Sequence, residues 1–191
     1  LSFISGNHDS FRIADFLNDE ELRLAYLFIY TMPGVPYLFA GDELGQKTNR
    51  NLTSKEGGYQ RTGTRIPMVF DNTENRGFSK CKDVSKLYLP IDNETVSVME
   101  QLEDKNSLLN FIKELIKIRK SEDDLRSKDF KLLDKPLAYS RGKIKVFINL
   151  KDEDQKFEVE SGEILLSVGK VEFSAGKLVL KKHQAVIFKE A

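Results

Sequence analysis

Three consecutive polar residues near the start of the chain, Asn7, His8 and Asp9, carry side chains suited to acid–base or ligand-binding chemistry. They follow an apolar run, residues 1–5, and the break at Gly6. An apolar run predicts a strand buried on both faces, and α/β barrels and open α/β sheets carry their sites at the C-terminal ends of such strands. Because Asn and Asp are also turn residues, an ordinary polar turn is the alternative at this point.

A second apolar run, residues 35–40, predicts another buried strand, and the turn after it contains Asp42 and Glu43. The segment between the two runs predicts a helix, because Asn18 and Glu21 have the spacing of a capping box and an apolar face follows them. A strand, a helix and a strand in this order indicate a parallel, right-handed crossover.

Such a crossover brings the C-terminal ends of both strands to one face of the sheet. Asp9 is therefore expected on the same face as Asp42 and Glu43. For Asp42 and Glu43 a solvent-exposed turn is the favoured interpretation, with a structural or calcium-linked role as the alternative.

Residues 41–105 show no strong periodicity and carry Gly, Pro, Asn and Asp among several aromatic and basic residues. Loops of this length in compact domains are either functional or disordered, and the aromatic content argues against disorder. We therefore expect an elaborated loop over the site, with a helical turn at residues 96–102. A helix capped by Asn106 follows, and the charged residues 121–127 predict a linker.

The remainder of the chain consists of short alternating segments separated by glycine turns. In residues 144–150 every second residue is aliphatic, which is typical of a strand. Strands are expected at residues 130–133, 137–141, 144–150, 156–160, 163–167, 171–173, 177–180 and 185–189. This pattern predicts a small antiparallel β-sandwich. With a boundary near Leu125, the chain is expected to contain two domains, residues 1–125 and residues 126–191.

Composition narrows the function classes. The 191 residues include 30 basic and 30 acidic side chains, so the net charge gives no indication of a nucleic-acid or membrane-surface partner. No apolar run approaches the roughly 18 residues that span a bilayer. A single cysteine, Cys81, rules out an internal disulfide framework and a cysteine-based zinc site.

The chain begins with Leu1 inside a predicted strand, and no leader sequence is apparent. It is therefore expected to be part of a longer protein. The compartment stays open, with the cytoplasm as the favoured expectation.

Several of these segments resemble the α-amylase family of glycoside hydrolases, family thirteen. Residues 3–9 are similar to the last of the short regions that define the family, and residues 32–45 are similar to its eighth barrel strand and the following loop. Residues 60–62 and 65–71 resemble a segment of the oligo-1,6-glucosidase and α-glucosidase branch. Three positions depart from that branch's usual Thr, Gln and Trp: Ile66, Val69 and Phe70. Further similarities to the branch lie at residues 75–79, 88–91 and 106–109.

The resemblance implies an α/β plus all-β fold: the C-terminal part of a (β/α)8 TIM barrel, strands seven and eight with their helices, followed by a small antiparallel β domain. It implies a retaining α-glucoside hydrolase or transglucosidase, in which a nucleophilic carboxylate and an acid/base carboxyl lie about 5–5.5 Å apart. In the family these two groups follow barrel strands four and five, and no residue here matches them. The isolated chain is therefore expected to be inactive.

The resemblance also assigns site residues. Asp9 matches the third aspartate, which stabilises an oxocarbenium-like transition state, and His8 matches the histidine that contacts the same sugar ring. Asn7 is expected to orient the loop more than to touch substrate. Arg12 either reaches the sugar pocket or pairs with a carboxylate. Arg65 either contacts substrate or forms a salt bridge that holds the loop.

No cofactor is expected for the chain itself, and the resemblance leaves calcium open for a longer parent protein. A metal site is not expected, because the sequence has only one histidine besides His8. The expected partner is an α-glucan or gluco-oligosaccharide, and the exposed strands of an incomplete barrel are expected to favour self-association. The competing hypothesis is a non-catalytic family member, or a carbohydrate-binding or interaction module.

Overall fold

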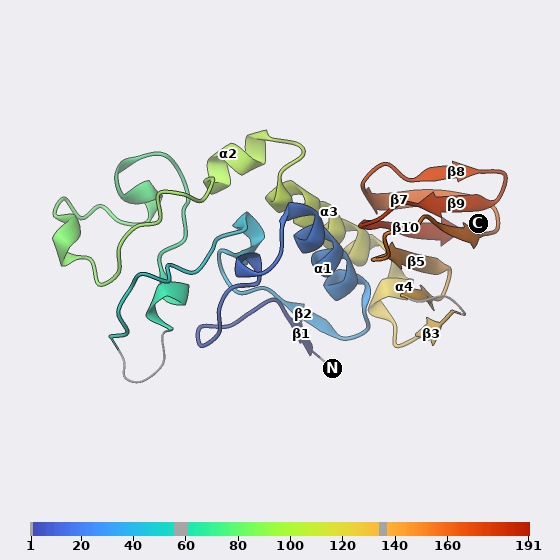
Figure 1. The fold of residues 1–191 in the computed structure, drawn as a ribbon, viewed down its shortest axis with the longest axis horizontal. Coiled ribbons are helices and arrows are strands. Elements are labelled where there is room, and N and C mark those ends of the chain that lie inside the picture. The colour runs from blue at the N-terminus through green and yellow to red at the C-terminus, as the bar shows by residue number, and fades with distance from the viewer. Residues whose placement is uncertain (1, 56–60, 134–136) are drawn as a thin grey trace. The chain divides into compact units, whose positions relative to one another are not determined.

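The structure is a computed structural model that describes residues 2–55, 61–133 and 137–191 (Figure 1). Leu1, residues 56–60 of the predicted loop and residues 134–136 lie outside the described part of the chain. Along the described chain, a strand–helix–strand unit is followed by a long segment of short helical turns, then by helices, and finally by a series of short strands.

The strand–helix–strand unit forms as predicted. Strand β1 covers Ser2–Ile4, helix α1 covers Asp19–Thr31 and strand β2 covers Val35–Tyr37. Helix α1 begins with the expected capping box: the Asn18 N–H donates to Glu21 Oε2 at 2.9 Å, and the Glu21 N–H donates to Asn18 Oδ1 at 3.0 Å. This reciprocal pair satisfies two backbone donors that no helical carbonyl can reach.

The two strands are neighbours in one sheet and run in the same direction. Ser5, directly after β1, donates its backbone N–H to the Tyr37 carbonyl at 3.0 Å. Its Oγ accepts a hydrogen bond from the Phe39 N–H, also at 3.0 Å. Because residues at the C-terminal ends of both strands meet each other, the pairing is parallel, as the crossover predicts.

The predicted burial of these strands on both faces is wrong for the described chain. Ile4 is 56% exposed, Val35 is 53% exposed and Tyr37 is 56% exposed. The second strand also ends early, since residues 38–40 are not in a strand. Among the described residues each strand has one hydrogen-bonded neighbour. Side chains that a further strand or helix would cover therefore remain in contact with water.

Three further helices follow. Helix α2 covers Val98–Glu103 and lies within two residues of the predicted helical turn. Helix α3 covers Leu108–Ser121. Helix α4, Asp123–Arg126, occupies the segment predicted to be a linker. Its acidic first turn and its basic last residue suit the helix dipole, which explains how a charged segment forms a helical turn.

The predicted cap of α3 is wrong by one residue. Ser107, not Asn106, is the N-cap: its carbonyl accepts from the Phe111 N–H at 3.0 Å, and its Oγ accepts from the Asn110 N–H at 3.2 Å. Both residue types are good N-caps, so sequence alone does not separate the two positions.

The long segment between β2 and α2 has no strand among its described residues, as predicted. Short 3₁₀ turns lie at Asp42–Leu44, Thr62–Arg65, Glu74–Gly77 and Val84–Lys86. The segment is tied to the start of α2, because the N–H groups of Val98 and Met99 donate to the carbonyls of Val69 and Phe70 at 3.1 and 3.0 Å.

The C-terminal strands form two antiparallel sheets. Their bounds are Lys131–Leu132 (β3), Ala138–Arg141 (β4), Ile144–Asn149 (β5), Gln155–Glu158 (β6), Gly162–Val168 (β7), Glu172–Ser174 (β8), Lys177–Leu180 (β9) and Gln184–Glu190 (β10). One sheet has the order β3-β4-β5-β10-β7, and the other has the order β6-β9-β8. In the larger sheet Val186 lies opposite Phe147 and Ile187 lies opposite Leu166.

Apolar side chains from both sheets share one core, which confirms the predicted sandwich. The larger sheet contributes Ala138, Phe147, Val186 and Phe188, and the smaller sheet and its adjoining turn contribute Phe157, Val159, Leu178 and Leu180. Along β6 and β9 the residues alternate between this core and more exposed positions, as at the surface of a sandwich. In contrast, β5 and β10 are buried over consecutive residues.

A buried polar anchor joins the end of α1 to β4. The Tyr139 hydroxyl lies 2.6 Å from Thr31 Oγ1. Arg141 is fully buried and donates to the carbonyls of Thr31, Leu125 and Ser127. Desolvation raises the pKa of Tyr139, so that its phenol remains protonated and available for the hydrogen bond.

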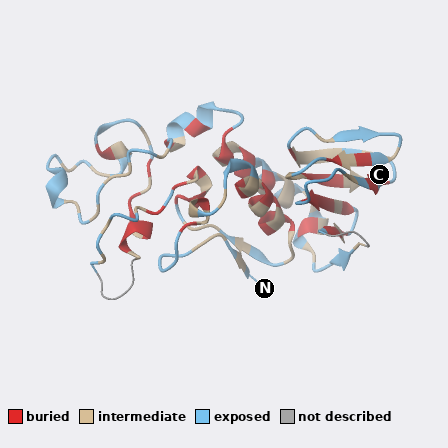
Figure 2. Ribbon diagram, viewed as in Figure 1, coloured by how far each residue is buried: buried red, intermediate tan, exposed pale blue. Residues whose placement is uncertain are grey.

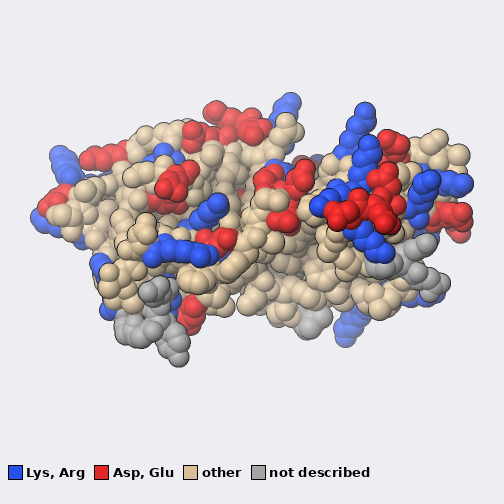
Figure 3. Space-filling model, in the orientation of Figure 1, with Lys and Arg blue, Asp and Glu red and all other residues tan. Residues whose placement is uncertain are grey.

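The chain divides into two compact units. One contains Leu1–Phe3, Arg23–Pro36 and Lys113–Ala191, and the other contains Ile4–Leu22 and Tyr37–Ile112. Buried residues concentrate in α1, α3 and the central strands of the sandwich (Figure 2). Acidic and basic side chains are intermingled on the face shown in Figure 3. None of the helices in residues 2–55, 61–133 and 137–191 has the length and apolarity needed to cross a membrane.

Candidate active site

A charged cluster surrounds Asp9. Its Oδ1 accepts hydrogen bonds from Arg61 Nη1 at 2.7 Å and from Arg65 Nη2 at 3.0 Å. Arg65 also donates from Nε to the His8 carbonyl at 3.0 Å. His8 Nε2 lies 3.3 Å from the other carboxylate oxygen, Asp9 Oδ2. These residues lie in one compact unit, so the fold gathers two segments more than 50 positions apart around one carboxylate.

Asn7 shapes the turn that presents the carboxylate. Its Oδ1 accepts the Asp9 N–H at 2.8 Å, which is an Asx-type contact two residues along the chain. The contact is the one expected of a residue that orients the loop.

The electrostatic environment of Asp9 favours its ionised form. Desolvation by its neighbours raises the pKa of Asp9, but the hydrogen bonds from Arg61 and Arg65 and the charges of His8 and Arg61 outweigh it, so the pKa lies below its usual range. The carboxylate is half exposed, and His8 is 64% exposed. An ionised, accessible carboxylate can accept hydrogen bonds from sugar hydroxyls or stabilise positive charge.

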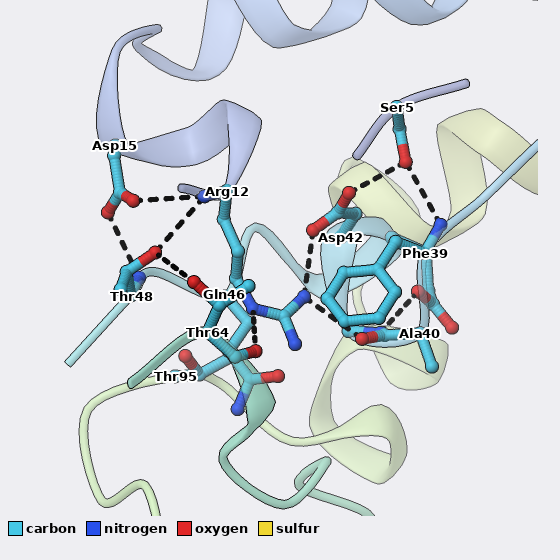
Figure 4. A network of polar contacts seen from close by, with 12 residues as sticks. Ser5, Arg12, Asp15, Phe39, Ala40, Asp42, Gln46, Thr48, Thr64 and Thr95 are labelled. Atoms are coloured by element: carbon cyan, nitrogen blue, oxygen red, sulfur yellow. Dashed lines mark hydrogen bonds and ion pairs between the residues drawn. The ribbon is translucent and has the colours of Figure 1, made fainter. Parts of the chain in front are cut away.

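Arg12 is directed inward and does not reach solvent. Its side chain is 2% exposed, and its Nη1 lies 2.8 Å from Asp42 Oδ1 (Figure 4). Nη1 also donates to the Ala40 carbonyl at 2.9 Å, and Nε donates to the Thr64 carbonyl at 3.2 Å. The guanidinium lies over the Phe39 ring, 4.6 Å from its centroid. Of the two roles considered for Arg12, the structure contains the ion pair with a carboxylate, and direct sugar contact stays an untested prediction.

The favoured interpretation of Asp42 as a solvent-exposed turn residue is wrong. Asp42 is fully buried, and its Oδ2 accepts a hydrogen bond from Ser5 Oγ at 2.6 Å (Figure 4). Desolvation raises the pKa of Asp42, while the Ser5 and Arg12 hydrogen bonds and the Arg12 charge act in the opposite direction. Glu43 is partly buried and accepts the Gly41 N–H at 2.8 Å. The structural alternative therefore applies to Asp42.

Two glycines permit this close packing. Gly41 has φ +95°, and a Cβ there would lie 2.1 Å from Gln46 Oε1. A Cβ on Gly63 would lie 1.9 Å from the Asn49 carbonyl oxygen. At Gly63 the clash is with backbone, so a side chain there would push the two segments apart. At Gly41 the positive φ disfavours any residue with a Cβ.

Arg61 is the functional candidate that sequence reasoning missed. It donates to Asp9 at the shortest distance in the cluster, although in the sequence it is one of several basic residues in the long loop. The available signal is its place in residues 60–62, which resemble a segment of the oligo-1,6-glucosidase and α-glucosidase branch. For Arg65 the structure contains a salt bridge to Asp9, and substrate contact stays a prediction.

An open hollow of about 850 Å³ lies in the same compact unit. The hollow is lined by Asp15, Ile66 and residues 44–45, 47–51 and 91–96. Asp9 is not among the lining residues. In the described part of the chain no group of three or more His, Cys, Asp or Glu side chains is arranged to hold a metal ion.

The fold and the cluster define an α/β protein with an accessible carboxylate–arginine site at a strand end and an all-β C-terminal part. A family model described as alpha amylase, catalytic domain, matches residues 1–128. The chain belongs to the alpha-amylase family.

Relatives with assigned activities are similar over part of their length. A glucan 1,6-alpha-glucosidase of Streptococcus pneumoniae is 28% identical over 95% of this chain and 41% of the relative. A salivary alpha-glucosidase of Aedes aegypti is 29% identical over 63% of this chain and 23% of the relative. The chain therefore spans about a quarter to two fifths of the length of these relatives.

A solved structure shares the fold. The trehalulose synthase MutB of Pseudomonas mesoacidophila superposes with a TM-score of 0.78 at 22% identity, over 98% of this chain and 42% of that protein. At this level of identity the similarity concerns the fold alone.

Proposed function

We propose that this chain is the C-terminal part of a retaining α-glucoside hydrolase or transglucosidase that acts on α-linked gluco-oligosaccharides. The main observation behind this proposal is the His8–Asp9 pair directly after a parallel strand, where Arg61 and Arg65 donate hydrogen bonds to the Asp9 carboxylate. Membership of the alpha-amylase family and the alpha-glucosidase names of its relatives support the substrate class.

In this proposal β1 and β2 are strands seven and eight of the barrel. Residues 1–125 are the end of the barrel domain, and residues 126–191 form an appended β domain. The coverage of only 23–41% of the relatives' length supports the view that the remaining barrel strands come from sequence outside this chain. The nucleophile and the acid/base would then lie outside it as well, and the isolated chain would be inactive.

Asp9 would stabilise the oxocarbenium-like transition state by accepting hydrogen bonds from sugar hydroxyls, which strengthen as positive charge develops on the ring. His8 would contact the same sugar ring, and its exposure leaves it accessible. Arg65 would bind substrate or set the orientation of Asp9, and Asn7 would hold the turn. An ionised Asp9 is required for this role, and the neighbouring cations favour that state.

The second candidate is a non-catalytic family member or a carbohydrate-binding module. The coding sequence upstream of Leu1 distinguishes the two: an Asp and a Glu in the family's nucleophile and acid/base motifs support the enzyme. Their absence supports the second candidate.

The decisive experiment joins the chain to its upstream-encoded segment and follows hydrolysis of 4-nitrophenyl α-D-glucopyranoside, with the product anomer read by proton NMR. We expect turnover with retention of configuration, and no turnover by the 191-residue chain alone. Asp9→Asn should lower kcat by about 10²–10³-fold, the scale of losing one transition-state-stabilising group. An active joined protein that Asp9→Asn leaves unchanged would contradict the assignment of Asp9.

A further inference from the structure

We propose that the buried Arg12–Asp42 ion pair is a positioning unit that fixes the Asp9 carboxylate against Arg61 and Arg65. The significance of this positioning for catalysis rests on the proposed function. Arg12 and Asp42 are 2% and 0% exposed, so neither side chain is accessible to a molecule in solution. Their action on Asp9 must pass through the segments that they hold.

The Asp9 cluster cannot maintain its geometry by its own contacts. Asp9 is half exposed, and Arg61 and Arg65 are 28% and 22% exposed. Ion pairs in contact with water contribute little to stability, because water and side-chain entropy compete with them. A site that must orient a carboxylate needs support from a rigid, buried layer.

Arg12 provides this buried support because it connects the segment that carries Asp9 to the turn that carries Arg65. It lies three residues after Asp9, and its Nε donates to the carbonyl of Thr64, the residue directly before Arg65. Thr64 is fully buried and returns a hydrogen bond from its Oγ1 to the Ser10 carbonyl at 3.0 Å. The segment that carries Asp9 is therefore fastened to the turn that carries Arg65, at a point one residue from each.

The other end of the Arg12 side chain fixes this assembly to the strand ends. Nη1 bonds to Asp42 and to the Ala40 carbonyl, and Asp42 in turn accepts from Ser5 at the end of β1 (Figure 4). The backbone N–H of Arg12 donates to Asp15 Oδ2 and Thr48 Oγ1, both at 3.1 Å. The planar Arg12 guanidinium bonds at once to Asp42 and to the carbonyls of Ala40 and Thr64, whereas a lysine ammonium cannot reach all three from one point.

The test separates positioning from stability in the full 191-residue chain. Arg12→Met/Asp42→Leu removes both charges while keeping side-chain volume, because replacing a buried ion pair by apolar groups usually preserves folding. Arg12→Lys keeps the charge opposite Asp42 but loses the planar fork. Val69→Ala is the matched control: Val69 is fully buried in the same compact unit and lies outside the Arg12 network.

The readouts are nitrogen-15 relaxation of the Arg65 Nε–H, which donates to the His8 carbonyl, and a carbon-13 titration of the Asp9 carboxyl group. For Arg12→Lys and the double variant we expect the Arg65 Nε–H order parameter to fall below about 0.6, the range of flexible groups. The Asp9 midpoint should rise toward its ordinary value of about 3.9. Val69→Ala should lower the unfolding midpoint and change neither readout.

A folded Arg12→Lys or double variant with both readouts at their wild-type values would overturn the proposal, as would equal changes in Val69→Ala. If the double variant does not fold, Arg12→Lys alone decides by the same criteria. Neither readout needs a sugar. A failure of positioning is therefore distinguishable from a failure of the proposed function, which the turnover of the joined protein measures.

Discussion

Asp9 Oδ1 lies 2.7 Å from Arg61 Nη1, although 52 positions separate the two residues in the chain. No pattern in the sequence indicates that these two residues are in contact. The contact forms because the turn Thr62–Arg65 folds back onto the segment after β1, where Arg65 binds the same oxygen. The Asp9 carboxylate is therefore in contact with two arginine side chains, and the first prediction concerns the effect of Arg61 on its pKa.

Arg61→Gln should shift the titration of Asp9 to higher pH. Desolvation alone would raise the pKa of Asp9, and the hydrogen bond from Arg61 is the first of the contacts that lower it. Because the folded-state pKa is depressed, the contribution of Asp9 to stability is present above its unfolded value of about 3.9 and is lost as pH falls through the folded value. Carbon-13 titration of the Asp9 carboxyl group measures the shift.

Lys86→Gln is the matched control for this prediction, because Lys86 is an exposed cation that pairs with a different carboxylate, Asp83. It should leave the Asp9 midpoint where it is. In the joined, active protein, the acid side of the kcat/KM profile should move to higher pH in Arg61→Gln only. An unmoved Asp9 midpoint in Arg61→Gln would contradict the cluster described here.

Asp42→Asn should destabilise the chain by about 3–5 kcal/mol, because it leaves the Arg12 guanidinium buried without a counter-charge. Urea unfolding followed by circular dichroism measures the change. The double variant Arg12→Met/Asp42→Leu should recover most of the loss, since it leaves no buried charge.

Asp152→Asn is the control for an exposed pair, because Asp152 bonds to Lys182 at the surface. That variant should lower the free energy of unfolding far less than Asp42→Asn does, because an exposed ion pair contributes little. If Asp42→Asn costs no more than Asp152→Asn, the Arg12–Asp42 pair does not stabilise the fold.

Tyr139→Phe should cost about 1–2 kcal/mol, because it leaves the Thr31 hydroxyl without the partner that lies 2.6 Å away. Desolvation raises the pKa of Tyr139. With the folded pKa raised, the stabilising contribution is complete below the unfolded value of about 10 and is lost as pH rises through the folded value. An ultraviolet titration should therefore show that Tyr139 ionises only when the chain unfolds in alkali, so that Tyr139→Phe has one late-ionising tyrosine fewer than the wild type.

The isolated chain should self-associate through β1 and β2. These strands expose Ile4, Val35 and Tyr37 beside unpaired sheet edges, and such edges pair with other chains. Tyr37→Lys places a charge at the edge and should shift light-scattering mass toward the monomer. Leu132→Lys, at a residue 70% exposed in the sandwich, is the control and should leave the mass unchanged. A wild-type chain that is monomeric at high concentration would refute the prediction.

Local sequence signals were sufficient to predict most of the helices and strands. The Asn18–Glu21 capping box set the start of α1, and the alternation in residues 144–150 predicted β5 nearly to its bounds. The glycine turns predicted a series of short antiparallel strands, and the apolar run before Gly6 placed His8 and Asp9 after a strand. Each of these signals acts over a few residues, where hydrogen bonding and side-chain direction follow directly from residue type and spacing.

The tertiary structure decided which polar groups are buried and which residues meet. Asp42 has the sequence setting of an exposed turn, yet it is fully buried because Arg12 and Ser5, 30 and 37 positions away, supply its counter-charge and hydrogen bond. Arg61 joins Asp9 for the same reason: a distant segment folds against it. The sequence alone determined the strand–helix–strand unit, the sandwich and the position of the His8–Asp9 pair. The fold determined the environment of that pair, because desolvation and long-range pairing depend on neighbours that no local pattern records.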